Sequence, residues 1–177
     1  MSVAEPTQRR FTREEYSRMA DSGMFIGQRV ELIEGEVVVL SPQKPRHYLS
    51  MCQAGKVLEE AFGRGFWVRV QGPLDFGAFS EPEPDISVVK GAADDYSDHH
   101  PDTAVLLVEV SESSLAYDRF RKGSLYARSG ISDYWIINLI DNQLEVYRAP
   151  VVDPSHPYGF RYQAPTILKP GATISPL

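Results

Sequence analysis

The run Ala104-Val-Leu-Leu-Val-Glu-Val110 most constrains the fold, because it reads as a doubly buried strand and yet carries a carboxylate. Continuous apolar runs of this length are typical of strands covered on both faces. Glu109 in such a strand loses much of its hydration, and an unpaired buried charge is costly enough that it neutralises or finds a cation. The sequence therefore predicts a layered α/β protein in which Glu109 has a specific cationic partner.

A second carboxylate, Asp85, begins another apolar strand in Glu81-Pro-Glu-Pro-Asp-Ile-Ser-Val-Val89 and could share that cation. Two converging carboxylates form a hard-oxygen site suited to magnesium or manganese. Each carboxylate also has a simpler interpretation. Pro-Asp before a strand is common turn chemistry, and Glu109 could form a structural ion pair with Arg69.

The order of expected elements indicates a mixed central sheet flanked by helices on opposite faces. Cys52 lies among the apolar residues of the second helix and is expected in the core. The expected elements are a helix from 12 to 23, a hairpin around Glu34-Gly35, a helix from 47 to 62, strands at 66–70, from 85 and up to 110, a helix at 115–128, strands at 133–138 and 143–148, and short strands near 160–162 and 166–168.

The composition is that of one soluble domain of 177 residues, with a loose lead-in over 1–10 and a proline-rich segment over 150–177. No apolar stretch approaches the ~20 residues that a membrane span needs, and the N-terminus lacks the core of a signal peptide. A single cysteine fits a reducing cytoplasm. The net charge of −6 argues against a generally adhesive nucleic-acid binder but leaves room for a local basic rim.

The helix expected over 115–128 places Asp118, Lys122 and Tyr126 four residues apart on one face. Because this helix begins a few residues past Glu109, Lys122 can reach back over the carboxylate. The simpler alternative is an exposed lysine paired with Asp118. Arg119 belongs to a solvated face or contacts a nucleic-acid backbone.

His47, at the start of the second helix, is open to two interpretations: a contact to a substrate phosphate, or a capping and structural role.

An ordered set of motifs over residues 11 to 149 resembles the Uma family of restriction-type endonucleases, long catalogued as a domain of unknown function. That family is common in cyanobacteria and other bacteria and belongs to the PD-(D/E)xK nuclease superfamily. The motifs are Glu31-Leu-Ile-Glu-Gly-Glu, Pro45-Arg-His47, Pro84-Asp85, Val108-Glu-Val-Ser, Asp118-x-x-x-Lys122-x-x-x-Tyr126 and Gly130-Ile-x-Asp-Tyr-Trp. Asp133 stands where the family more often has glutamate.

The resemblance implies a restriction-endonuclease-like core that hydrolyses phosphodiester bonds, in DNA, with magnesium or manganese. It implies that Asp85, Glu109 and the backbone carbonyl of Val110 hold the metal ion. Glu31 would complete the acidic cluster. The expected assembly is a homodimer. The alternative is a catalytically inactive nuclease-fold protein that binds nucleic acid or a protein partner.

The superfamily's lysine normally follows the second acidic residue by two positions, where this chain has Ser111. The resemblance implies that the lysine has migrated to the next helix, as Lys122. There it would orient the attacking water or offset the charge that develops on the phosphorus.

Overall fold

The computed structural model describes residues 7–177, so the first six residues of the expected lead-in lie outside it. The chain divides into two compact units. One comprises the chain up to Pro42 together with Asp75–Pro82, and the other comprises Gln43–Leu74 and Glu83–Leu177. The expectation of a single domain remains a prediction. Within residues 7–177, no helix has the length and apolar character that a membrane crossing requires.

The first unit contains helix α1 (Arg13–Asp21) and the hairpin of β1 (Arg29–Ile33) and β2 (Glu36–Leu40). The predicted capping box is present: Thr12 and Glu15 each bond the other's backbone N–H at the start of α1. The hairpin turn has φ of 53° at Glu34 and 82° at Gly35, the two left-handed residues of a tight hairpin turn.

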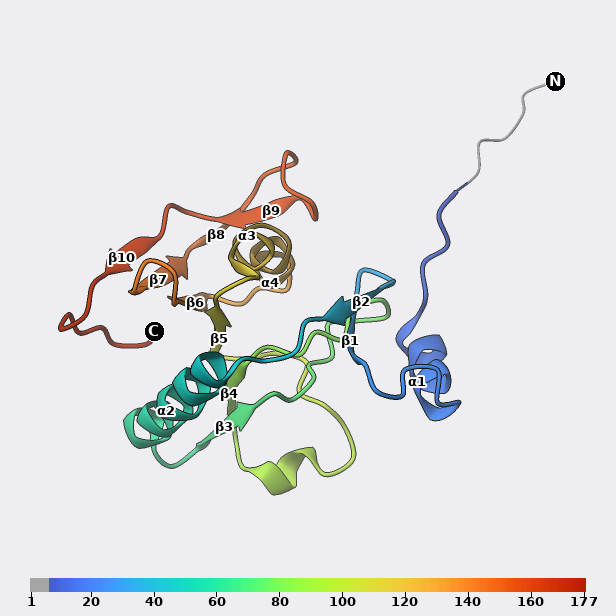
Figure 1. Ribbon diagram of the computed structural model, residues 1–177, viewed down its shortest axis with the longest axis horizontal. Helices are drawn as coiled ribbons and strands as arrows, with labels where there is room; N and C mark the ends of the chain where they lie inside the picture. The colour runs from blue at the N-terminus through green and yellow to red at the C-terminus, as the bar shows by residue number, and fades with distance from the viewer. Residues whose placement is uncertain (1–6) are drawn as a thin grey trace. The chain divides into compact units, whose positions relative to one another are not determined.

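The second unit is built on a mixed six-stranded sheet in the order β10-β7-β6-β5-β4-β3 (Figure 1). Only β5 and β6 run parallel, and a parallel pair requires a long crossover between its strands. The strands are β3 (Phe66–Val70), β4 (Ile86–Lys90), β5 (Leu106–Ser111), β6 (Asp133–Asn138), β7 (Gln143–Arg148) and β10 (Thr166–Leu168).

The crossover between β5 and β6 is one helical stretch with an irregular middle. It consists of α3 (Leu115–Tyr117), the π-helical segment η2 (Asp118–Lys122) and α4 (Gly123–Arg128). The expected helix over 115–128 is therefore present, but it is not a regular α-helix. A short ribbon of β8 (Pro150–Val152) and β9 (Phe160–Tyr162) packs on α4, which explains why most of α4 is buried.

Helix α2 (Pro45–Phe62) and this crossover cover opposite faces of the sheet. Val108 and Val110 join the core with Met51 and Leu58 of α2. Since neighbouring strand residues point to opposite faces, Glu109 points to the crossover side. A 3₁₀ turn, η1 (Ala93–Tyr96), lies in the acidic loop after β4. The predicted fold class, a mixed sheet flanked by helices, is confirmed.

One expectation about the core is wrong. Cys52 is exposed rather than buried, and Leu49 and Val57 are also exposed, whereas Met51 and Leu58 face the sheet. Helix α2 carries apolar residues on more than one side, so periodicity alone does not identify the stripe that meets the sheet.

Candidate active site

The candidate site is a row of polar residues that crosses one face of the six-stranded sheet. Ile86 of β4 pairs with Val108 of β5, so continuing this register by one residue brings Asp85 opposite Glu109. Directly opposite residues share a face, with Cβ atoms roughly 5 Å apart. On the other side of Glu109 the register runs through Ile136 to Glu145 of β7. Glu109 and Glu145 thus lie on the face under the crossover helix, and Asp85 lies near Glu109.

Lys122 is the cationic partner of Glu109. Its Nζ lies 3.0 Å from Glu109 Oε1, and the Tyr126 hydroxyl donates to the same oxygen at 2.6 Å. Lysine and glutamate are both almost completely buried. The predicted reach of Lys122 over the strand's carboxylate is confirmed, while its catalytic role remains a prediction.

The alternative partner of Glu109, Arg69, is engaged elsewhere. Its guanidinium donates to the Pro73 carbonyl at 3.0 Å and lies over the Trp67 ring. Burial lowers the pKa of Arg69. The structural pair of Arg69 with Glu109 that the sequence left open is therefore not the arrangement observed.

Asp85 is held from two sides. Its Oδ2 accepts the Val110 backbone N–H at 2.8 Å and lies 3.1 Å from His47 Nε2. The bond to Asp85 raises the pKa of His47 against the effect of burial, and the Val110 backbone adds to the rise. His47, from the first turn of α2, therefore contacts the candidate metal ligand Asp85, and the backbone of Val110 lies beside the same carboxylate.

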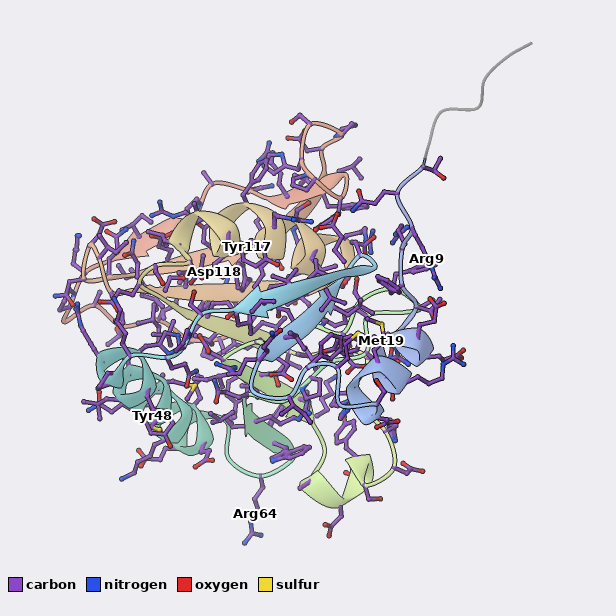
Figure 2. All side chains as sticks on the ribbon, turned by 45° about the vertical axis from the view of Figure 1, so that its right-hand side comes forward. Arg9, Met19, Tyr48, Arg64, Tyr117 and Asp118 are labelled. Atoms are coloured by element: carbon purple, nitrogen blue, oxygen red, sulfur yellow. The ribbon has the colours of Figure 1, made fainter. Side chains whose placement is uncertain are left out.

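From the sequence, Asp118 was expected only as the partner of an exposed Lys122, but both residues are buried. Asp118 lies in the π-helical segment of the crossover (Figure 2). It accepts hydrogen bonds from the Ser111 and Ser114 hydroxyls. Its place four residues before Lys122 was the available signal. Burial raises the pKa of Asp118, and Lys122 opposes that rise.

The cluster carries more acidic than basic groups. Burial raises the pKa of Glu109 to about 8; Lys122 opposes the rise, and the charges of Asp85 and Asp118 add to it. Three carboxylates therefore interact at close range with one lysine and one histidine. A cluster with this excess favours the uptake of a proton or of a further cation.

The chemistry of these donors fits magnesium or manganese. Within residues 7–177, no three His, Cys, Asp or Glu side chains come close enough to form a ready-made metal cage. Magnesium in phosphate-processing sites is usually held by one or two carboxylates, with water and substrate phosphate completing its shell. Asp85, Glu109 and the Val110 carbonyl supply a set of that kind.

Two further residues were predicted for the site, Glu31 and Arg119. Glu31 is fully buried on β1 of the first unit, and its part in the site remains a prediction. Arg119 forms a two-bonded ion pair with Glu145, with Nε 2.9 Å from Oε2. A contact between Arg119 and substrate would therefore compete with this pair.

The six-stranded mixed sheet flanked by helices is a nuclease-like α/β fold. The chain belongs to the Uma2 family, described as "Putative restriction endonuclease", whose model matches residues 13–177. The fold is similar to the crystal structure of a putative nuclease of the DUF820 family from Anabaena variabilis, with a TM-score of 0.65 and 16% identity over 93% of this chain and 88% of that one. No curated protein matches the sequence.

Proposed function

We propose that this chain is a metal-dependent nuclease that hydrolyses phosphodiester bonds in DNA. The observation that carries the proposal is the buried contact of Lys122 with Glu109, next to Asp85, in a cluster with excess negative charge. The nuclease-like fold and the family description support the reaction class.

In this proposal Asp85, Glu109 and the Val110 carbonyl hold a magnesium or manganese ion. When bound, such an ion supplies Lewis-acid activation of water and phosphate. Tyr126 fixes the Glu109 carboxylate by its hydrogen bond. Lys122 donates to the attacking water or to a phosphate oxygen, which offsets negative charge in the transition state. In-line attack would expel the sugar 3′ oxygen and leave a 5′-phosphate.

A second candidate function is supported by the same contacts. In the structure Lys122 is bonded to Glu109 and His47 to Asp85, so both carboxylates already have internal partners. A protein that keeps the nuclease fold only to bind nucleic acid or a protein partner would need no other partner for these carboxylates. The net charge of −6 agrees with such a role as well.

Nicking of supercoiled plasmid DNA with Mg²⁺ or Mn²⁺ tests the first function. Asp85→Asn, Glu109→Gln and Lys122→Met should each lower the rate about 100-fold or more, as the loss of one transition-state contact does in other enzymes. Glu59→Gln and Lys56→Met are matched controls at exposed positions of α2 and should keep the wild-type rate. Equal rates in all variants would reject the site.

Calorimetry with Mn²⁺ separates the two functions. A nuclease of this kind should bind the ion, and Asp85→Asn or Glu109→Gln should weaken binding. If the wild type neither nicks DNA nor binds Mn²⁺ at millimolar concentration, the second function, binding without catalysis, is favoured.

A further inference from the structure

The outer face of α2 exposes large apolar side chains. Met51, Gly55 and Leu58 face the core, and Leu49 and Val57 on the other side of the helix are 57% and 63% exposed. Tyr48, on the flank, is also exposed and projects from the helix in Figure 2. The outer face of a helix that packs on a sheet is ordinarily polar. This face is therefore an unusual place for leucine and valine.

The exposed residues form an ordered stripe with opposite charges at its ends. Arg46, Leu49, Gln53, Val57 and Glu60 follow one another at intervals of three or four residues, so they share one side of the helix. All five are exposed. Within residues 7–177, the side chains of Arg46 and Glu60 have neither a hydrogen bond nor an ion pair. The basic end and the acidic end of the stripe are thus both available for ion pairs with another molecule.

This stripe is complementary to itself when it is reversed. In an antiparallel pair of helices centred on Gln53, Leu49 meets Val57 of the second copy and Arg46 meets its Glu60. The two charged ends are about 21 Å apart on each helix at 1.5 Å per residue, so both ion pairs form together. A two-fold interface requires this kind of match, in which one patch meets its own copy.

We propose that a second copy of this chain docks on this face through antiparallel pairing of the two α2 helices. The contact is small, since it consists of one helix pair, and contacts of that size give weak dimers with dissociation constants on the order of micromolar or higher. This contact involves only the surface of α2 and is independent of nuclease activity.

Sedimentation equilibrium over a wide range of protein concentration tests the proposal. The wild type should pass from monomer to dimer, and Leu49→Asp should shift the transition to at least tenfold higher concentration. Lys90→Glu, a charge reversal at an exposed position of β4, should leave the transition unchanged. A wild type that remains monomeric throughout would overturn the proposal.

Charge exchange tests the antiparallel register. Arg46→Glu and Glu60→Arg should each weaken the dimer, because like charges then face each other, and the double variant should recover most of the wild-type affinity. Both positions are exposed, so the variants should keep the circular dichroism of the wild type even if Leu49→Asp fails to fold. Weakening by both single variants without recovery in the double variant would overturn the register.

Cys52 provides an independent probe because it is exposed, is the only cysteine, and lies one residue from the centre of the pair. A short bis-maleimide should link two wild-type chains, with Cys52→Ser as the control. The yield should fall in Arg46→Glu and return in the double variant. An unchanged yield of cross-linked dimer in these variants would contradict the pairing.

Discussion

At the scale of single residues, the site depends on charges that compensate one another inside the protein. Lys122 and Glu109 are both buried and bonded at 3.0 Å. Removal of one member of a buried ion pair leaves the other without compensation, and this typically costs more free energy than the intact pair contributes. The stability of a variant that lacks Lys122 or Glu109 therefore depends on which of the two side chains remains.

We expect Lys122→Met alone to lower the free energy of unfolding by about 2–4 kcal/mol, because it leaves the acidic excess unopposed. The double variant Glu109→Gln/Lys122→Met should recover more than half of that loss. Urea unfolding of the wild type, both single variants and the double variant in the presence of a chelator measures the coupling. Additive losses would show that the two side chains do not compensate each other.

Glu145 is a second buried carboxylate, and its partners keep it ionised. Burial opposes the charge, but hydrogen bonds from Arg119, Asn138, Tyr147 and Gln143 outweigh it and lower the pKa of Glu145 from 4.5 to about 2. A carboxyl group whose pKa is lower in the folded state stabilises the protein above its unfolded-state pKa. That contribution disappears as the pH falls from about 4.5 to about 2.

The pH dependence of Glu145→Gln follows from this linkage. At pH 7 the variant should be less stable than the wild type by about 2 kcal/mol, a shift of one pKa unit being worth about 1.4 kcal/mol and the half-exposed Arg119 weakening the effect. The difference should shrink steadily below pH 4.5. Denaturant unfolding at a series of pH values measures it, and a difference that is constant with pH would contradict the assignment.

At the scale of elements, the π-helical segment shapes the crossover that carries Lys122. Gly123 N–H bonds the Asp118 carbonyl five residues back, a spacing that often marks functional sites in helices. The Asp118 carboxylate links this segment to Ser111 at the end of β5 and to Ser114. Asp118 therefore fixes the start of the crossover against the strand that carries Glu109.

We expect Asp118→Ala to destabilise the protein by about 1–3 kcal/mol, because the buried Ser111 hydroxyl and the Ser114 hydroxyl lose their acceptor. Asp102→Ala, at an exposed loop position, is the matched control and should change stability by less than about 0.5 kcal/mol. Thermal and urea unfolding measure both. If the two variants were equally stable, Asp118 would not be an anchor of the crossover.

At the scale of the whole molecule, the proposed metal site links ligand binding to global stability. An ion that binds only the folded protein stabilises it by about 2.7 kcal/mol at a concentration one hundred times its dissociation constant. Mn²⁺ should therefore raise the melting temperature of the wild type in a concentration-dependent way. Differential scanning calorimetry should show this rise for Glu59→Gln and not for Asp85→Asn. An equal rise in Asp85→Asn would place the ion elsewhere.

Much of the fold was predictable because local signals in this chain are strong. Thr12 with Glu15 identified the start of α1, Glu34-Gly35 identified the hairpin turn, and the apolar run ending at Val110 identified β5. The contact of Lys122 with Glu109 was predictable from the short connection between strand and helix. These features depend on residues close together along the chain.

Other features required the folded chain. The environment of Asp118 depends on the Ser111 hydroxyl at the end of β5. The ion pair of Arg119 depends on Glu145 in β7, two strands away from β5 in the sheet. The exposure of Cys52 depends on which stripe of α2 meets the sheet. Helical period alone fixes none of these, because each is set by packing between elements distant in sequence.

The amino-acid order by itself determined that a carboxylate sits in a doubly covered strand, that a lysine follows it on a helix, and where most elements begin and end. Only the tertiary structure decided which groups neutralise one another, because charge compensation in the interior depends on distances across the sheet. Strand register placed Glu109 and Glu145 on the face under the crossover, which supplies their partners Lys122 and Arg119, whereas α2 supplies His47 to Asp85.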